Sequence, residues 1–453
     1  NDQPSEKSVH KNSGLSDFMW VWSQFLEHEL VLLDTHQPRE VMDISVMQGD
    51  PVFEWGGSIP FSRSRYDPAT GSGVNNPRQQ VNGQTAFLDG SSIYGTDVLR
   101  AAALRRFDGT GRLKCSESLH GDLLSYNLAG FQNAQSASNT EPSAYFLSGD
   151  VRVNEHVMVS AMHTLFMREH NRLCMELPAR YPYLAGDDEA TYQFARKIVG
   201  AIIQSITYYE FLPALLGNDA LNPYQGYQEE VNPSISSVFA TVAFRFTHNM
   251  MPEQLRLGRS RKTLKTRETY FNPRLLRYLG VEPLLEGRMR QSMRKLSVDI
   301  PEDLRNLLLN YMGGRAQTFL DFSALTIQRG RDHGLPDYNT VRQAYGLTRI
   351  QRFEDMTADH KLQDALEKLY QSVDNIDPWV GAMIESPLEH AQIGALNYVV
   401  LKDQFERLRD GDRYWFENDP LLSELRSTLS KIRLSHLLRR NTKLRHVAEN
   451  VFR

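Results

Sequence analysis

The spacing of apolar residues is the feature that most restricts how this chain folds. Over residues 15–33 they recur at intervals of three and four, which predicts an amphipathic helix. The same spacing predicts helices over residues 155–176, 192–211 and 237–249, whereas runs that alternate apolar and polar residues are scarce. The sequence therefore predicts a mainly α fold with very little β structure.

Length and composition fit a soluble globular protein. The chain has 453 residues, 41% of them hydrophobic and 23% charged. Residues 1–13 are polar and are expected to form an arm, followed by a single domain over residues 14–453. A net charge of -4 gives no sign of a nucleic-acid partner. The apolar runs fall short of the ~20 residues that a membrane helix needs, so no membrane span is expected.

The N-terminus and the cysteines bear on location. The chain begins NDQPSEKSVHKNSG, with neither an initiator Met nor an apolar signal core, so either a signal was removed or the N-terminus was trimmed. We expect a secreted, extracellular or periplasmic protein. Cys115 and Cys174 either form one bridge or are free and buried, and their separation does not decide between the two. The oligomeric state is equally open.

The stretch WSQFLEHEL, residues 22–30, places polar side chains inside an apolar helix. Gln24 and His28 are four residues apart and share a face, whereas Glu27 and Glu29 diverge from that face in opposite directions. In isolation the cluster fits a buried histidine held by its neighbours. A metal-ligand interpretation has little support, because neither HExxH nor a Cys/His spacing is present.

A second motif, NGQTAFLDGSSIYG, gathers oxygen ligands. Thr85, Phe87, Asp89 and Ser91 alternate along an extended loop, so their oxygens can converge on one side. Hydroxyl, carbonyl and carboxylate oxygens suit Ca²⁺, which takes roughly six to eight of them. Asp-Gly-Ser is also ordinary turn chemistry, so this motif alone leaves both interpretations open.

The motif SGDVRVNEH opens the second predicted helix. Arg152 precedes this helix and Glu155 stands in its first turn. Acidic residues in a first turn are often partners of the helix dipole and nothing more. On its own, this motif therefore does not indicate a catalytic site.

Two motifs place histidine and arginine near apolar helices. In VAFRFTHNMMPEQ, Arg245 lies one turn before His248. His248 is either a satisfied core residue or an axial haem ligand, beside an arginine that meets a haem propionate. IQRGRDHGLPDYNTVR is either a charged loop running into a helix or the source of a hydrogen-bond partner, Asn339, and a further cation, Arg342.

Together these motifs resemble one family, the animal-type haem peroxidases of the peroxidase–cyclooxygenase superfamily. FLDGSSIYG, MHTLFMREHNRL, ITYYEFLPALLG and QRGRDHGLPDYN look like its signatures, in order, from about Trp22 to about Arg342. Residues 345–453 are less distinctive but fit the helical C-terminal region of the family. The resemblance implies a single, mostly α-helical domain around a buried haem b, with a calcium site.

The resemblance also implies a role for each candidate residue. The distal catalytic set would be His28, Gln24 and Arg152. The iron would be bound by His248, with Asn339 orienting it and the haem propionates held by Arg245 and Arg342. The calcium ligands would be Glu29, Thr85, the carbonyl of Phe87, Asp89 and Ser91. Ester links to the haem would form at Glu155 and Glu27.

Two departures from the family pattern matter. The family usually has Asp at the positions of Glu27 and Glu29, so both roles remain chemically reasonable while their geometry is less certain. At the position of His156, some members carry a methionine that forms a third haem link. A histidine cannot form that sulfonium bond, so at most two esters are expected.

The activity that the resemblance implies is the reduction of hydrogen peroxide, as in a response to oxidative stress. The donors would be iodide, bromide or thiocyanate, or else phenols, with poor use of chloride. One alternative is a fatty-acid dioxygenase of the same superfamily, but Arg245 stands where cyclooxygenase-like members carry a radical tyrosine. The other is a non-enzymatic haem-containing adhesion or matrix module, which the complete catalytic set disfavours.

Overall fold

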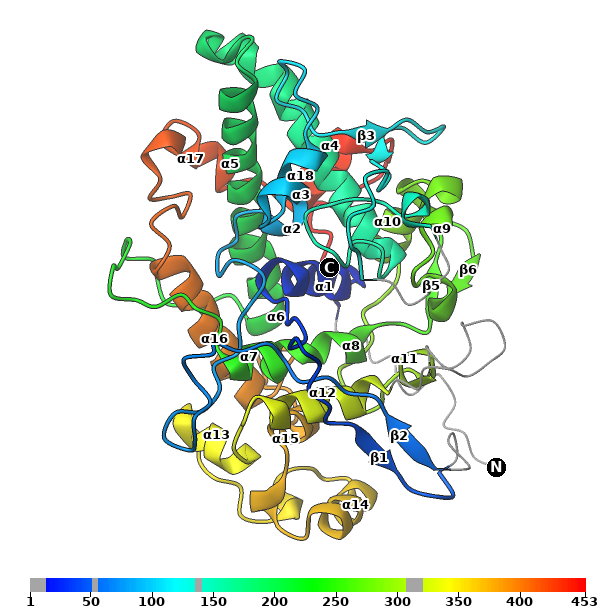
Figure 1. The fold of residues 1–453 in the computed structure, drawn as a ribbon, viewed down its shortest axis with the longest axis vertical. Helices are drawn as coiled ribbons and strands as arrows, with labels where there is room; N and C mark the ends of the chain where they lie inside the picture. Colours follow the sequence, from blue (N-terminus) through cyan, green and yellow to red (C-terminus); the bar gives the residue numbers. More distant parts are fainter. Residues whose placement is uncertain (1–13, 51–55, 135–140, 307–320) are drawn as a thin grey trace.

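Helices are the main regular structure of the computed structural model, which describes residues 14–50, 56–134, 141–306 and 321–453 (Figure 1). In these residues the strands form three two-stranded antiparallel ribbons, β1–β2, β3–β4 and β5–β6. The predicted mainly α fold is confirmed. The arm expected at residues 1–13 lies outside the described residues.

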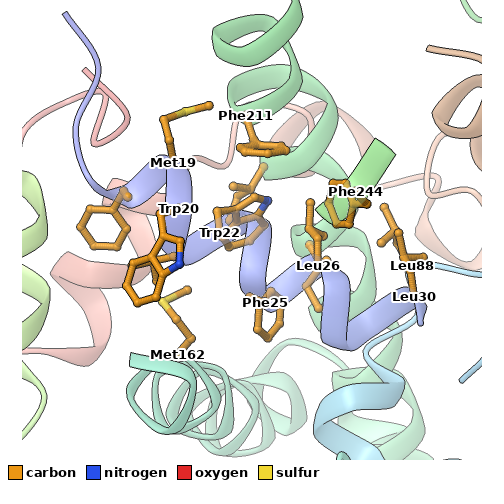
Figure 2. Packing of buried hydrophobic residues seen from close by; sticks show 14 of the residues in the cluster. Met19, Trp20, Trp22, Phe25, Leu26, Leu30, Leu88, Met162, Phe211 and Phe244 are labelled. Carbon is orange, nitrogen blue, oxygen red and sulfur yellow. The ribbon is translucent and has the colours of Figure 1, made fainter. Parts of the chain in front are cut away.

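Helix α1 (Phe18–Leu30) runs through the middle of the molecule, and every one of its residues is buried (Figure 1). Figure 2 shows its Trp22 and Phe25 among apolar side chains of other elements. Phe25 stacks on Phe166 of α4, with the ring centroids 5.0 Å apart. Truncating such a side chain to Ala typically costs about 3–5 kcal/mol. This packing carries the polar cluster of residues 24–29 into the core.

Two long helices pack around α1. Helix α4 (Val157–Arg180) contacts both α1 and α5 (Asp188–Ile206), and α5 continues through a π turn (Thr207–Phe211) into α6 (Leu212–Leu216). The segment Asp188–Leu216 is long and apolar enough to cross a membrane, but 89% of its most apolar window is buried inside the protein. It is therefore a core element of this fold.

The helix predicted over residues 237–249 is broken. Helix α7 (Ser237–Thr241) ends at Val242, whose φ of -122° and ψ of -74° are not helical, and a 3-10 turn (Ala243–Phe246) and α8 (Thr247–Met250) follow. Phe239 and Phe244 stack across the break with their ring centroids 4.9 Å apart. Aromatic packing of this kind overrides the local helical pattern.

The remaining elements are short. Those before α4 are β1 (Ile44–Val46), β2 (Gly57–Ile59), α2 (Ser91–Tyr94), α3 (Val98–Leu104), β3 (Cys115–Ser116) and β4 (Leu123–Leu124). Those after α8 begin with β5 (Gln254–Arg256), β6 (Thr263–Lys265), α9 (Pro273–Leu279), α10 (Glu282–Met289) and α11 (Glu302–Asn306). The C-terminal part holds α12 (Phe322–Asp332), α13 (Tyr338–Ala344), α14 (His360–Tyr370), α15 (Pro378–Ile384), α16 (Ala395–Asp410), α17 (Arg426–Leu429) and α18 (Leu434–Asn441).

The start of α1 is anchored by residues from distant parts of the chain. Asp17 forms an ion pair with Arg288 of α10, and neither side chain is exposed. The amide N–H of Ser16 donates to the carbonyl of Phe452 at 2.8 Å, so the C-terminus lies beside α1 (Figure 1). Removing one partner of a buried ion pair costs about 3–5 kcal/mol. These contacts fix the position of the helix that carries the polar cluster.

Candidate functional site

A cavity of about 270 Å³ lies beside the C-terminal half of α1. Its walls come from α1, the turn before α4, the α7–α8 segment and α12. The residues that line it are Gln24, Glu27, Leu32, Leu33, Arg152, Glu155, Thr241, Arg245, His248, Phe322, Leu325, Thr326 and Arg329. The fold therefore brings to one cavity Gln24, Glu27, Arg152, Glu155, Arg245 and His248, all of which the sequence analysis had singled out.

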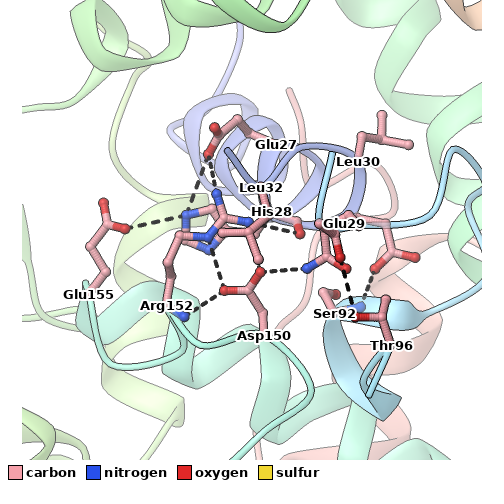
Figure 3. A network of polar contacts seen from close by, with 12 residues as sticks. Glu27, His28, Glu29, Leu30, Leu32, Ser92, Thr96, Asp150, Arg152 and Glu155 are labelled. Carbon is pink, nitrogen blue, oxygen red and sulfur yellow. Dashed lines mark hydrogen bonds and ion pairs between the residues drawn. The ribbon is translucent and has the colours of Figure 1, made fainter. Parts of the chain in front are cut away.

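His28 stands behind this wall and is 1% exposed. Its Nε2 lies 2.9 Å from Gln24 Nε2. The same atom lies 3.5 Å from Glu27 Oε2 and 3.6 Å from Glu155 Oε2 (Figure 3). Because an amide nitrogen only donates, we assign His28 Nε2 as the acceptor and place the ring proton on Nδ1. Burial, together with the charge of Arg152, lowers the pKa of His28 to about 3. The imidazole is therefore neutral near pH 7 and able to accept a proton.

Arg152 is held by an aspartate that the sequence analysis missed. Asp150 is fully buried and accepts hydrogen bonds from the N, Nε and Nη2 atoms of Arg152 at 2.6, 3.0 and 2.7 Å (Figure 3). Gln84 Nε2 donates to the same carboxylate at 2.6 Å. Burial alone would raise the pKa of Asp150, but the charge of Arg152, the influence of His28 and the hydrogen bonds from Arg152 together outweigh it, and the net shift is downward. Arg152 thus meets the cavity as a fixed positive charge.

Two carboxylates of the cavity have opposite pKa shifts. Glu27 Oε1 lies 3.0 Å from Arg245 Nη1, and Glu27 Oε2 lies 3.7 Å from Arg152 Nη1. Burial would raise the pKa of Glu27, but these two guanidinium charges outweigh it and lower the pKa. For Glu155, burial dominates and raises the pKa to about 7, although Arg152 acts in the other direction. One cavity therefore holds an ionised carboxylate beside one that is readily protonated.

His248 meets the cavity from α8 and is partly buried. Its ring centroid lies 5.7 Å from that of Phe322. Among the described residues, neither of its ring nitrogens has a hydrogen-bond partner. Burial, with the charge of Arg245, lowers the pKa of His248 to about 4, so the ring is neutral near pH 7. A neutral imidazole with a free nitrogen is the form that binds a metal.

Asn339 and Arg342 lie away from this cavity, contrary to expectation. Both are buried in α13. Asn339 Nδ2 donates to Ile350 O at 2.9 Å and to Asp374 Oδ1 at 2.7 Å, while Arg342 forms an ion pair with Glu385. These contacts join α13 to the segments packed on it. The roles predicted for Asn339 and Arg342, orienting His248 and binding a propionate, stay predictions.

The preceding helix, α12, supplies the wall instead. Four of its residues share one face at helical spacing and line the cavity: Phe322, Leu325, Thr326 and Arg329. Gly334, with φ of +67°, follows α12, and the chain turns there before α13 begins. Arg329 therefore lines the cavity from α12, whereas Asn339 and Arg342 lie beyond the turn in α13. Arg329, in the same QRGRDHG run, was the available signal.

Four of the five predicted calcium ligands gather in one loop. Thr85 Oγ1 lies 3.3 Å from Phe87 O, 3.2 Å from Asp89 Oδ1 and 2.8 Å from Ser91 Oγ. These oxygens differ in kind, since they come from two hydroxyls, a carbonyl and a carboxylate. That is a donor set suited to a hard cation.

The fifth predicted ligand, Glu29, is bonded to the backbone of the same loop. Its carboxylate accepts from the N–H groups of Gly90, Ser91 and Ser92 at 2.6, 3.1 and 2.9 Å. Burial, and after it the negative charge of Asp89, raises the pKa of Glu29 to about 7. Two carboxylates thus stand near each other at the junction of α1 and the loop, where a cation would relieve their repulsion.

His156 is a structural residue in this fold. Its Nδ1 accepts from Met158 N at 3.0 Å and caps α4, and its Nε2 lies 2.7 Å from Thr269 Oγ1. Its ring packs edge-on against Trp20 and Tyr270, with centroid distances of 5.0 and 4.9 Å. Both ring nitrogens are occupied, so His156 has no free atom for a bound group.

The cavity as a whole suits a flat cofactor with carboxylate arms. His248 offers a free imidazole nitrogen, Arg245 and Arg329 offer positive charge, and leucine and phenylalanine side chains cover the wall between them. Gln24 Oε1 is buried at the wall and has no hydrogen-bond partner among the described residues. The fold and the site define a haem-binding protein of the helical type.

Comparison with known sequences gives the family. Residues 3–452 match the family described as animal haem peroxidase. Thyroid peroxidase from Mus musculus is 33% identical over 499 residues, which cover 100% of this chain and 54% of the relative. Lactoperoxidase from Mesocricetus auratus is 36% identical over 470 residues, which cover 95% of this chain and 66% of the relative. The chain spans about half the length of the thyroid peroxidases that it matches.

Comparison with solved structures agrees. Peroxidase A from Dictyostelium discoideum superimposes with a TM-score of 0.90 at 30% identity, covering 100% of this chain and 89% of that one. A fatty acid alpha-dioxygenase from Arabidopsis thaliana superimposes with a TM-score of 0.79 at 20% identity, covering 97% and 74%, which shows a shared fold alone. This chain belongs to the animal haem peroxidase family.

Proposed function

We propose that this protein is a haem peroxidase that reduces hydrogen peroxide and oxidises small anions or phenols. The observation that carries the proposal is a fixed Arg152 in the cavity that His248 also lines, with a neutral His28 directly behind its wall, 2.9 Å from the lining residue Gln24. Family membership agrees with it. The site gives no separate support to either alternative, a fatty-acid dioxygenase or a non-enzymatic haem-containing module.

The residues around the cavity fit a haem b. His248 would bind the iron, and Arg245 and Arg329 would meet the propionates. Bound haem iron supplies the redox chemistry that splits the O–O bond of hydrogen peroxide. We further propose ester links at Glu155 and Glu27, because both carboxylates reach the edge of the same cavity.

The distal residues would handle the proton of hydrogen peroxide. His28 accepts this proton at Nε2 and then returns it to the leaving oxygen, as general base and then general acid. Gln24 holds the ring in the matching tautomer through the contact at Nε2. Arg152 presents its charge where the O–O bond polarises, and it needs no rearrangement because Asp150 already holds it.

We propose that the 85–91 loop holds Ca²⁺ through Thr85, Phe87 O, Asp89 and Ser91, with Glu29 contributing from α1. Because Glu29 adjoins His28, the cation would also fix the rotation of α1 at the distal residue. This role accounts for the carboxylate pair at the junction better than turn chemistry alone.

The proposed donors are iodide, thiocyanate, bromide and phenols. Chloride is the hardest of these halides to oxidise, and His156, which caps α4 and donates or accepts at both ring nitrogens, stands where a methionine link would otherwise withdraw electrons from the haem. We therefore expect poor chlorination near neutral pH.

A donor panel tests the function. Steady-state turnover of hydrogen peroxide would be measured with iodide, bromide, chloride, thiocyanate and guaiacol, alongside haem content from the Soret absorbance. We expect turnover with iodide, bromide, thiocyanate and guaiacol, and little turnover with chloride. A normal Soret band without turnover of any donor would favour the binding module. Acid-butanone extraction and mass spectrometry of haem peptides from Glu155→Gln and Glu27→Gln test the esters separately.

A further inference from the structure

A basic segment of the chain lies outside the haem cavity. Residues 253–268, EQLRLGRSRKTLKTRE, hold six basic and two acidic residues, although the whole chain has a net charge of -4. This segment forms the β5–β6 ribbon and the turns around it, at the edge of the molecule (Figure 1). Positive charge is therefore concentrated locally in a protein that is acidic overall.

A groove of about 890 Å³ opens between this ribbon and residues 290–294. Arg256, Arg261, Arg290 and Arg294 line it, against a single carboxylate, Glu253. It shares no lining residue with the haem cavity. The groove is thus a separate, strongly cationic surface.

Within the described part of the chain, three of the four guanidinium groups form no ion pair, although the charges of Glu253 and Asp299 act on Arg294 from a greater distance. Arg256, Arg261 and Arg294 form no ion pair there, and Arg290 reaches Glu286 only at 3.3 Å. Arg294 Nη1 is also buried without a hydrogen-bond partner among the described residues. An unsatisfied buried donor is costly, so a bound anion would stabilise this arrangement.

The floor of the groove is rigid. Gln291 Nε2 donates to Gln254 O at 2.9 Å, and its Oε1 accepts from Arg256 N at 3.0 Å, so it ties β5 to the segment after α10. The Arg256 guanidinium donates to the carbonyls of Ser260 and Arg259, each at 3.2 Å. The positive charge is therefore held in place before any ligand binds, which lowers the entropy lost on binding.

We propose that this groove binds a linear sulfated polysaccharide. Several guanidinium groups spread along one groove match a polymer with repeated negative charges better than a single small anion. None of the described lining residues is aromatic, whereas proteins that bind nucleic-acid strands stack bases on aromatic rings. Thr263 Oγ1 donates to Gln254 Oε1 at 2.8 Å, which leaves the amide nitrogen of Gln254 at the same surface as a donor for sugar hydroxyls.

The test is the binding of a fluorescent heparin-derived hexasaccharide to the full chain, measured by anisotropy over a range of salt concentrations. The unmodified protein should bind, and affinity should fall as salt rises. Arg261→Glu should weaken binding by about tenfold or more. It should also reduce the slope of log affinity against log salt by about one, because one charge contact is lost. Arg294→Gln should act in the same direction.

The matched control is Arg352→Glu, the same charge change at an arginine whose side chain is 70% exposed, on a part of the chain that does not line the groove. Equal weakening by Arg352→Glu would mean that net charge governs binding, and would overturn the proposal. Equal binding of a desulfated hexasaccharide would overturn it too, as would tighter binding of single-stranded DNA of matched charge. Thermal midpoint and peroxide turnover, both unchanged in Arg261→Glu, show that the variant is folded and keep this test independent of the proposed peroxidase activity.

Discussion

The two faces of the haem cavity are built differently. On the distal face, formed by α1 and the turn before α4, protein contacts fix each functional side chain, as His28 is held by Gln24 and Arg152 by Asp150. On the proximal face, formed by α8 and α12, the ring of His248 lies beside Phe322 and has no hydrogen-bond partner among the described residues. Each distal side chain therefore has a partner within the protein, although Gln24 Oε1 and His28 Nδ1 have none among the described residues, whereas the proximal histidine is left free to bind.

This difference indicates a division of labour. A polar network that is satisfied in advance can act in the reaction without rearranging. A ligand residue with few partners gains its orientation from the bond that it makes to iron. Changes on the proximal face should therefore affect whether haem is kept, and changes on the distal face should affect how fast bound haem reacts.

The largest expected effect is that of His248→Ala. Because His248 is the one neutral imidazole that lines the cavity within the described residues, its removal should abolish stable haem binding and with it all turnover. Iron content and Soret absorbance per chain measure this directly. His28→Ala is the matched control and should keep its haem. A normal ferric spectrum and normal turnover in His248→Ala would refute the assignment of the ligand.

The next effect is that of His28→Ala on rate. A general acid–base group contributes roughly 10²–10⁴-fold, so the reaction with hydrogen peroxide should slow by that order while haem content stays similar. Stopped-flow mixing with peroxide at fixed pH gives the rate constant. Arg152→Ala should slow the same step. If both variants reacted as fast as the unmodified protein, the distal face would have no role in proton handling.

A smaller effect is expected at Asp150, which acts through Arg152. Asp150→Asn keeps the shape of the side chain but removes the charge that holds the guanidinium group. Loss of a supporting residue of this kind typically costs about 10–100-fold in activity. A double-mutant cycle separates the roles, because Asp150→Asn should have little further effect once Arg152 is Ala. Additive losses would mean that Asp150 acts independently of Arg152.

The contrast between the two faces also marks how far the sequence alone could predict the site. The distal cluster on α1 was predictable because Gln24 and His28 are one helical turn apart, and helical spacing fixes which side chains share a face. Arg245 and His248, three residues apart, also line one cavity, although a 3-10 turn and α8 stand in place of the single predicted helix. Which side chains within one turn share a face does not depend on how the rest of the chain packs.

Relations that depend on the path of the chain were not predictable. Asn339 and Arg342 follow the turn after α12, and the direction of that turn decides whether they or Arg329 reach the cavity. The break at Val242 likewise depends on aromatic packing between distant elements, including Phe405 against Phe239 and Phe244. Asp150 was not predicted because Arg152 was considered without asking which carboxylate would hold its guanidinium group.

A pair of arginine variants tests which arginine of the proximal face meets a haem propionate. Arg329→Ala should weaken haem retention by about tenfold, the value of one charged hydrogen bond, because Arg329 lines the cavity. Arg342→Ala should instead lower thermal stability, since it leaves Glu385 buried and unpaired, while haem retention stays close to normal. Haem transfer to apomyoglobin measures retention. The reverse pattern would restore Arg342 as the propionate ligand.

The smallest expected change in rate comes from removing calcium, which acts on the distal face from outside the cavity. The proposed ion bridges the 85–91 loop and Glu29, the neighbour of His28 on α1. At a free calcium concentration a hundred times its dissociation constant, binding would stabilise the fold by about 2.7 kcal/mol. Chelation should therefore lower the thermal midpoint clearly while slowing the peroxide reaction less than any variant above. Without any chelator, the thermal midpoint of Asp89→Asn should already be as low as that of the chelated unmodified protein. The chelator should then lower it little further, because the substitution has already impaired the calcium site. Metal analysis that finds no calcium in fully active protein would remove the ion from the site, and the contacts of Glu29 with Gly90, Ser91 and Ser92 would then hold the distal helix alone.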